Sequence, residues 1–77
     1  MSDTSDLQQR LGVRIRRRRA ALGLTQCVLG SRVGVSRATI ANVEAGRQNL
    51  TLRRLEGLAR ALETGLDELF RPGPDAR

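Results

Sequence analysis

The sequence predicts an all-α domain of five short helices. Apolar residues recur every three or four positions along most of the 77-residue chain, while the alternation of β-branched residues that marks strands is scarce. Glycines and small capping residues divide the chain into segments of helical length. A chain this short buries only about 60% of the surface that it exposes when unfolded, so the predicted core is small.

The first helix is expected to run from residue 6 to about residue 22. Ser5 would cap it, and Gln8, three residues later, would complete a capping box. Gly23 follows in the C-terminal position that glycine favours, and it would end the helix. The apolar stripe of this helix consists of Leu7, Leu11, Ile15 and Leu22.

The next two helices are expected to form a pair joined by a tight turn, and this pair is the most informative part of the chain. Thr25 caps the first of them, Gly34 allows the chain to reverse, and Ser36 caps the second. The second helix runs to Ala45, and Gly46 stops it. The inward residues of the pair are Leu29, Val33, Ile40 and Val43.

Two further helices complete the predicted domain. Thr51 caps the fourth after a polar loop, and a short fifth helix covers residues 66–70. The apolar stripe of the fourth helix is Leu52, Leu55, Leu58, Ala59 and Leu62. Two prolines near the C-terminus end the structure, so the folded domain is expected over residues 6–70, between flexible ends at 1–5 and 71–77.

Positive charge is concentrated in the N-terminal half of the chain. The net charge is +6, but residues 7–43 contain eight arginines and no acid, whereas residues 44–77 contain six arginines and six acids. A basic half that includes the helix pair predicts a polyanionic partner, although a solvated, soluble surface would look the same in the sequence. All 14 basic residues are arginine, which suits phosphates, yet the bias extends to positions with no evident contact role.

The residue inventory argues against an enzyme. The chain has no histidine and a single cysteine, so the usual general bases, nucleophile pairs and zinc clusters are missing, and we expect no cofactor or metal. Cys27 is expected to be a small buried residue. No apolar run is long enough for a membrane span, so no membrane partner is expected.

The outer face of the third helix carries residues that suit contact with DNA bases. Arg37 has the donors to bind guanine O6 and N7, and Asn42 has the geometry to pair with an adenine edge. Ala38 or the methyl group of Thr39 would contact a thymine methyl. The alanines on this face would allow close approach to a flat partner, although alanine is also simply a good helix former.

Two features beside this helix predict contacts with phosphate. Gln26 lies just inside the second helix, next to backbone amides that have no partner within the helix and suit an anion. The loop that begins at Arg47 would hold the next phosphates along the strand. A solvent-facing glutamine and an exposed loop arginine are the alternative interpretations.

The chain resembles the xenobiotic-response-element type of helix-turn-helix protein, the phage-repressor-like family of bacterial and phage DNA-binding domains. The resemblance covers about residues 11–70, and the matching positions are Thr25, Gln26, Leu29, Val33, Gly34, Ser36, Ile40 and Glu44 to Gly46. It implies a lambda-repressor-like domain of five helices that binds operator DNA, usually as a dimer. The chain departs from the family at Gly30, where alanine is usual, and at Glu63, where a helix-ending glycine is common.

The resemblance also implies roles for individual residues. The base-reading residues would be Arg37, Ala38, Thr39 and Asn42, and the phosphate-binding residues would be Thr25, Gln26, Ser36, Arg47, Asn49 and Thr51. The family suggests a buried ion pair between Arg19 and Glu44, and Glu44 does fall on the inner side of its helix, where it needs a partner. A helical wheel places Arg18 nearer the centre of the inner stripe, but we expect Arg19 to be the partner.

These observations favour a sequence-specific, double-stranded DNA-binding transcriptional regulator that acts as a homodimer on a palindromic operator. The compact size is similar to that of restriction–modification controller proteins. Because the partner is DNA and no membrane span is expected, we expect a cytoplasmic, nucleoid-associated location. Leu66, Leu69 and Phe70 form the candidate dimer surface, with core closure as their other role. Two alternatives stay open: the antitoxin of a toxin–antitoxin pair, and a basic adaptor that binds RNA or a protein. An antitoxin would have a toxin as its protein partner, and a regulator would have a polymerase.

Overall fold

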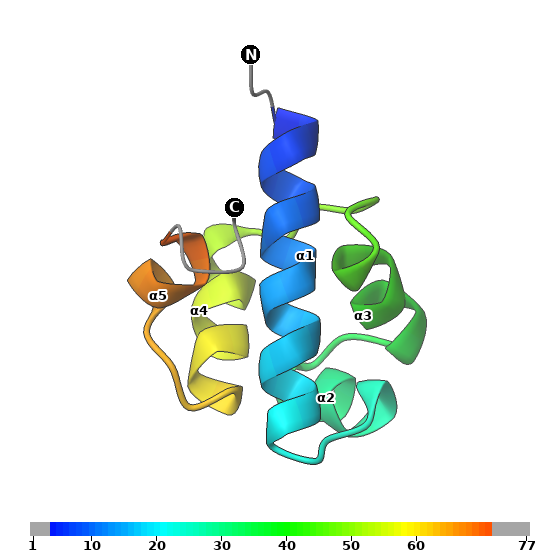
Figure 1. The fold of residues 1–77 in the computed structure, drawn as a ribbon. Coiled ribbons are helices and arrows are strands. Elements are labelled where there is room, and N and C mark those ends of the chain that lie inside the picture. Colours follow the sequence, from blue (N-terminus) through cyan, green and yellow to red (C-terminus); the bar gives the residue numbers. More distant parts are fainter. Residues whose placement is uncertain (1–3, 72–77) are drawn as a thin grey trace.

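The computed structural model describes residues 4–71, and these form five α-helices without a strand (Figure 1). The helices are α1 (Thr4–Ala21), α2 (Gln26–Val33), α3 (Arg37–Glu44), α4 (Leu52–Ala61) and α5 (Leu66–Phe70). The predicted all-α fold of five helices is confirmed. Of the ends that the sequence predicts to be flexible, residues 1–3 and 72–77 lie outside the described residues.

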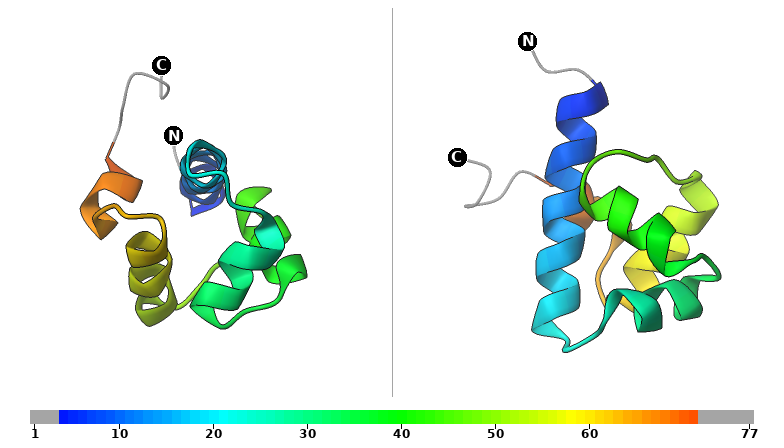
Figure 2. Two further views of the ribbon diagram at one scale, coloured as in Figure 1. Left: turned by 90° about the horizontal axis from the view of Figure 1, so that it is seen from below. Right: turned by 90° about the vertical axis from the view of Figure 1, so that its right-hand side faces the viewer.

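The long helix α1 runs along one side of the domain, and the four shorter helices lie beside it (Figure 1). A view along α1 shows α2 and α3 on one flank and α4 and α5 on the other (Figure 2). α1 packs against α3 and α5, while α2 packs against α3 and α4. The helix pair α2–α3 is thus held by α1 through α3 and by α4 through α2. In the part of the chain that is described, no helix is long and apolar enough to cross a membrane.

Side-chain caps and a left-handed glycine set the boundaries of the short helices. The hydroxyl groups of Thr25, Ser36 and Thr51 each accept a hydrogen bond from the backbone N–H three residues later, at 3.0, 3.1 and 3.2 Å. Gly34 ends α2 with a φ of 84°, and its N–H donates to the Gly30 carbonyl at 2.8 Å. The three caps and the glycine turn that the sequence predicts for these helices are confirmed.

Expectations about several individual residues are wrong. α1 begins at Thr4, so Ser5 lies inside its first turn and is not the cap. Leu52 is 64% exposed, because it is the first residue of α4 and the buried stripe of that helix begins one turn later, at Leu55. Cys27 is exposed near the start of α2 and does not contribute to the core.

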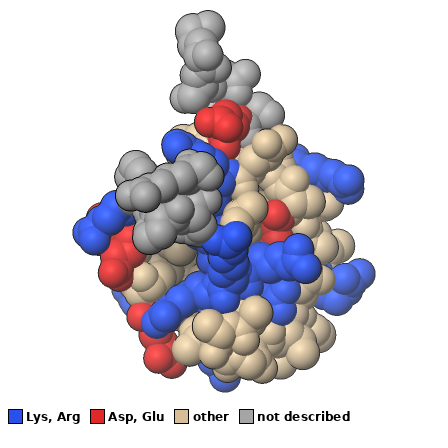
Figure 3. Space-filling view, viewed as in Figure 1, with Lys and Arg blue, Asp and Glu red and all other residues tan. Residues whose placement is uncertain are grey.

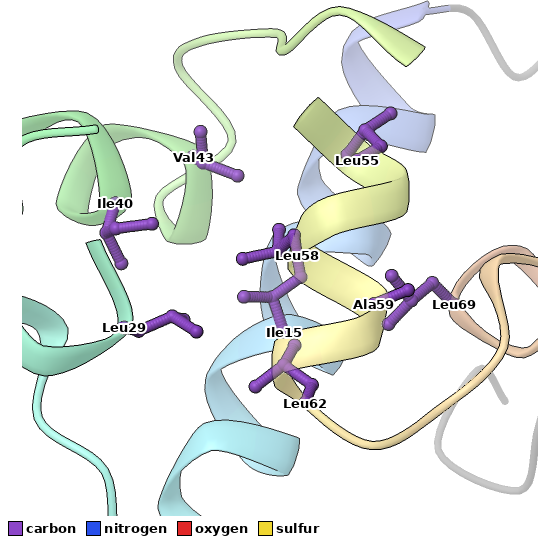
Figure 4. Packing of buried hydrophobic residues seen from close by; sticks show 9 residues of the cluster. All are labelled: Ile15, Leu29, Ile40, Val43, Leu55, Leu58, Ala59, Leu62 and Leu69. Atoms are coloured by element: carbon purple, nitrogen blue, oxygen red, sulfur yellow. The ribbon is translucent and has the colours of Figure 1, made fainter. Parts of the chain in front are cut away.

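The hydrophobic core lies where the five helices meet (Figure 4). Every helix contributes at least one residue, so none can separate without exposing apolar surface. The buried cluster consists of Ile15, Leu29, Ile40, Val43, Leu55, Leu58, Ala59, Leu62 and Leu69. This small core anchors the inner sides of α2 and α3 and leaves their outer sides to solvent.

A left-handed residue marks the turn between α4 and α5. Glu63 has a φ of 58°, in the left-handed region that favours glycine. Arg18 holds this turn, because its Nε donates to the Leu62 carbonyl at 2.8 Å and its Nη2 donates to the Glu63 carbonyl at 3.1 Å. The side chain of Arg18 therefore serves the end of α4, as its place on the helical wheel suggests, and Arg19 is left to meet α3.

Gly12 allows α1 to pack closely on α3. A β-carbon at Gly12 would lie 2.5 Å from the carbonyl oxygen of Glu44 and 2.6 Å from that of Val43. Both are backbone atoms, so relief requires the two helices to move apart. Gly57, in the middle of α4, has no such neighbour within 4 Å.

We expect Gly12→Ala and Gly57→Ala to change stability in opposite directions. Gly12→Ala forces α1 away from α3 and should cost about 1–3 kcal/mol, as overpacking usually does. Gly57→Ala restricts the unfolded chain at an open helical position and should add about 0.5–1 kcal/mol. Urea denaturation of both variants measures the free energy of unfolding. A Gly12→Ala protein as stable as the wild type would contradict the close approach.

Candidate nucleic-acid interface

The outer side of α3 contains the four residues that the sequence predicts to read bases. Arg37 and Ala38 are exposed, and Thr39 and Asn42 are half-buried. The inner side of the same helix is fixed in the domain by three buried residues, Ile40, Val43 and Glu44. The helix therefore has one side anchored and one side directed to solvent.

A buried ion pair joins the end of α1 to the end of α3. Arg19 Nε lies 2.6 Å from Glu44 Oε2, and Arg19 Nη2 lies 3.0 Å from Glu44 Oε1. Only 4% of the Glu44 side chain is exposed, so an unpaired carboxylate there would carry a large desolvation penalty. The hydrogen bonds to Glu44 raise the pKa of Arg19, whose Nη1 also donates to the Leu24 carbonyl at 2.8 Å. The pairing expected from the family is present.

Gln26 links this ion pair to the first residue of α3. Its Nε2 donates to Glu44 Oε1 at 3.1 Å, and its Oε1 accepts from Arg37 Nη1 at 3.3 Å. The two contacts define the orientation of the amide, because the nitrogen faces the carboxylate and the oxygen faces the guanidinium. The sequence analysis missed both contacts, which join residues 18 and 11 positions apart.

The other predicted phosphate contacts lie on exposed segments next to α3. Thr25, Ser36 and Thr51 are the exposed caps of α2, α3 and α4. Arg47 and Asn49 are exposed in the loop that connects α3 to α4. Helix N-termini carry backbone N–H groups without helical partners, so this part of the surface offers donors from three helices.

Arg54, which the sequence analysis did not single out, fixes the turn between α2 and α3. Its Nη1 donates to the Val33 carbonyl at 3.2 Å and to the Gly34 carbonyl at 2.9 Å. Carbonyl groups at the C-terminal end of a helix lack helical partners and carry partial negative charge, which a guanidinium stabilises. Nothing in the local sequence separates Arg54 from the other arginines, so no sequence signal would have found this contact.

Most of the positive charge lies on α1 and not on the helix pair. Six of the eight arginines between residues 7 and 43 belong to α1, and only Arg32 and Arg37 belong to α2 and α3. The face on which α1 lies shows a broad band of basic side chains (Figure 3). The positive charge of the N-terminal half is therefore carried mainly by α1, and the helix pair contributes two of these arginines.

The residues predicted for a dimer surface differ in their exposure. Leu69 is 4% exposed and belongs to the core, so it is not available to a partner. Leu66 is half-buried against the core, and Phe70 is 37% exposed. An apolar groove of about 190 Å³ lies beside Phe70, and Leu7, expected to point inward, is 38% exposed at this groove. Its other lining residues include Leu11, Val43, Asn49, Leu50 and Leu55.

A family model described as helix-turn-helix matches residues 15–69. This range begins within α1, contains α2, α3 and α4, and ends one residue before the end of α5. The chain therefore belongs to the helix-turn-helix family of the xenobiotic-response-element and phage-repressor type. This is a class of DNA-binding transcriptional regulators and not of enzymes.

Individual relatives agree with this assignment. An uncharacterized transcriptional regulator in the ATPase CF(0) region of Rhodospirillum rubrum is 42% identical over 60 residues, which is 78% of this chain and 56% of that protein. The restriction–modification controller protein C.AhdI from Aeromonas hydrophila has a TM-score of 0.78 at 36% identity, over 82% of this chain and 96% of its own. The P22 c2 repressor in complex with synthetic operator 9T has a TM-score of 0.76 at 36% identity, over 79% and 92% of the two chains.

We expect Glu44 to be coupled energetically to Arg19 and not to Arg18. Glu44→Leu leaves a guanidinium that is 15% exposed without its carboxylate and should cost about 3–5 kcal/mol. A double-mutant cycle with Arg19→Met should give a coupling of about 1–3 kcal/mol. The matched cycle with Arg18→Met should give less than about 0.5 kcal/mol, because Arg18 contacts carbonyl oxygens at the end of α4. Equal couplings in the two urea-denaturation cycles would contradict this assignment.

Proposed function

We propose that the protein is a sequence-specific regulator that places α3 in the major groove of double-stranded DNA. The observation that supports this most is the chain of contacts from the buried Arg19–Glu44 pair through Gln26 to Arg37. These contacts hold a long, exposed side chain at the start of α3 before DNA arrives. A side chain ordered in advance loses less conformational entropy when it binds.

Arg37 and Asn42 are the proposed base readers. A guanidinium has five N–H donors and Gln26 uses one of them, so Arg37 keeps enough donors to bind both O6 and N7 of a guanine. Asn42 has the donor and acceptor that an adenine edge requires, while Ala38 and the Thr39 methyl group suit a thymine methyl. Each bidentate contact is worth about 1–3 kcal/mol of discrimination between bases.

The phosphate contacts are proposed to come from the caps around α3. The hydroxyl groups of Thr25 and Thr51 accept backbone hydrogen bonds, and each keeps its own hydrogen to donate to a phosphate oxygen. Ser36 and Thr39 lie 3.0 Å apart through their hydroxyl oxygens, and whichever of them accepts keeps a hydrogen for the same purpose. Such contacts determine the register of the protein on DNA but carry no sequence information.

Gln26, Arg47 and Asn49 would extend this phosphate-binding surface. The Gln26 amide has two N–H groups, and the contact with Glu44 uses one of them. Arg47 and Asn49 are exposed in the loop before α4, where a guanidinium and an amide are accessible to the backbone of the strand.

We also propose that the protein acts as a homodimer on a palindromic operator. Phe70 and Leu66, next to the apolar groove at α5, provide the kind of surface that two identical chains bury together. The two copies of α3 would then reach half-sites about 34 Å apart. A regulator of this kind works in the cytoplasm, at the nucleoid.

Selection of fragmented genomic DNA by the purified protein at physiological salt tests sequence reading. The wild type should enrich a palindromic motif, and Arg37→Ala should lose the preference for one guanine, at a cost of about 1–3 kcal/mol. Arg47→Ala is the matched control, because loss of a phosphate contact weakens binding to all sequences alike. Flat enrichment by the wild type would contradict the proposal and favour an antitoxin or an adaptor.

Sedimentation analysis tests the dimer. The wild type should sediment as a dimer at micromolar concentration, and Phe70→Ser should shift it towards a monomer, because it removes an apolar side chain from the proposed interface. Leu52→Ser is the control, since Leu52 is also exposed and apolar but lies at the start of α4. A monomeric wild type would contradict the dimer.

A further inference from the structure

We propose that Arg54 is a positioning residue for sequence reading, because it holds the turn between α2 and α3 against the start of α4. α3 contains the proposed base readers, and the start of α4 and the loop before it contain proposed phosphate contacts. Arg54 would keep these two groups of contacts in register on the duplex. This role rests on the proposed function and deepens it, since it names a residue that sets the orientation of α3.

Arg54 belongs to the first turn of α4 and reaches across to the helix pair. Its backbone N–H donates to the Thr51 hydroxyl at 3.2 Å, so its main chain is part of the cap of α4. Its side chain donates through Nη1 to the Gly34 carbonyl at 2.9 Å and to the Val33 carbonyl at 3.2 Å. α2 and α4 pack against each other (Figure 2). One residue therefore joins the N-terminal end of α4 to the C-terminal end of α2.

The turn that Arg54 holds is packed on its other side as well. Gly30 has no side chain, and a β-carbon there would lie 2.6 Å from the Val35 carbonyl oxygen. The Gly30 carbonyl accepts hydrogen bonds from the N–H groups of Gly34 and Val35, at 2.8 and 2.9 Å. A β-carbon at Gly34 would lie 3.3 Å from Arg54 Nη1. The turn is thus fixed between α2 and the guanidinium, and Ser36, the cap of α3, follows two residues later.

The orientation of α4 relative to α3 is set mainly through α2, which packs against both helices. The loop that joins α3 to α4 connects them in sequence, but Arg47 and Asn49 within it are exposed. A change in the angle between α2 and α4 therefore moves the base readers relative to the phosphate contacts. Phosphate contacts determine the register of a protein on DNA, and groups that are not held in place in advance lose affinity when they are ordered on binding.

Loss of the Arg54 contact should loosen the turn and leave the domain folded. Hydrogen bonds from a charged donor are stronger than neutral ones, so the bonds to the two carbonyls restrain the turn. The side chain of Arg54 is nevertheless exposed, and exposed charged contacts add little to the stability of a whole domain. α4 itself is anchored in the core by other residues, among them Leu55 and Leu58.

A direct phosphate contact is the alternative role for Arg54. A guanidinium has five N–H donors, and the bonds to the turn use those of Nη1, so Nε and Nη2 keep theirs. The two bonds favour positioning, because they direct the guanidinium to carbonyl groups of the protein. The two roles differ in salt dependence. A phosphate contact adds about one to the log–log salt slope of DNA binding, whereas a contact within the protein adds nothing.

Amide hydrogen exchange of the DNA-free protein tests whether Arg54 holds the turn. Arg54→Met removes the donors, so the amides of Gly34 and Val35 should exchange about five-fold faster or more, while those of α1 should not change. Arg53→Met is the matched control, because it removes the same charge from the neighbouring exposed position of α4. It should leave exchange at the turn unchanged. Circular dichroism verifies that both variants are folded.

Binding to the selected motif and to a random duplex, each measured over a range of salt, tests the effect on sequence reading. Arg54→Met should lower the ratio of the two affinities by about 5- to 30-fold and leave the salt slope on the random duplex unchanged. Arg53→Met should keep the ratio. Arg54→Lys should restore part of it, because an ammonium group donates to the same carbonyls without the planar geometry of a guanidinium.

Several results would overturn the inference. Unchanged exchange at Gly34 and Val35 in Arg54→Met would mean that the turn holds without this side chain. An unchanged affinity ratio with a salt slope lower by about one would identify Arg54 as a phosphate contact. An equal fall of the ratio in Arg53→Met would assign the effect to local charge.

A wild type that prefers no motif would overturn the proposed function and, with it, the role of Arg54 in reading. The exchange rates are recorded without DNA, so they distinguish that failure from a turn that Arg54 does not hold.

Discussion

The buried contact between Arg19 and Glu44 is the constraint on which the other parts of the structure depend. It ties the end of α1 to the end of α3, and the bond from Arg19 to the Leu24 carbonyl also fixes the segment that leads into α2. Gln26, the first residue of α2, donates to Glu44 and so links α2 to the same ion pair. Burying two charges is costly, and an apolar pair of similar size would often be at least as stable. What the pair contributes is geometry, because a guanidinium and a carboxylate accept few mutual orientations.

Most of the fold could be predicted from the sequence, because it depends on chemistry between near neighbours. Thr25, Ser36 and Thr51 cap their helices through amides only three residues away, so the local pattern is sufficient to locate each boundary. Leu52 and Cys27 were predicted wrongly because no local rule decides burial in the first turn of a helix. There the outcome depends on which neighbouring helix covers the residue, and that is a property of the packed domain.

The candidate site divides in the same way. The outer residues of α3 could be predicted because the helical period places them opposite Ile40 and Val43, which are buried. The contacts of Gln26 and Arg54 could not, because they join distant parts of a chain in which 14 arginines offer the same chemistry to every carbonyl and carboxylate. The direction in which the arginines of α1 face was missed for a related reason. A sequence assigns charge to a segment, and only packing assigns it to a side of the molecule.

The turn before α5 limits how stable this domain is. Glu63 adopts a left-handed conformation there, which costs an ordinary residue about 1–2 kcal/mol. Natural domains are stable by only about 0.05–0.15 kcal/mol per residue, so a single backbone angle takes a sizeable share of the total in a chain of 77 residues. A substitution of Glu63, which is remote from α3, would therefore be an accessible first step in selection for growth at higher temperature.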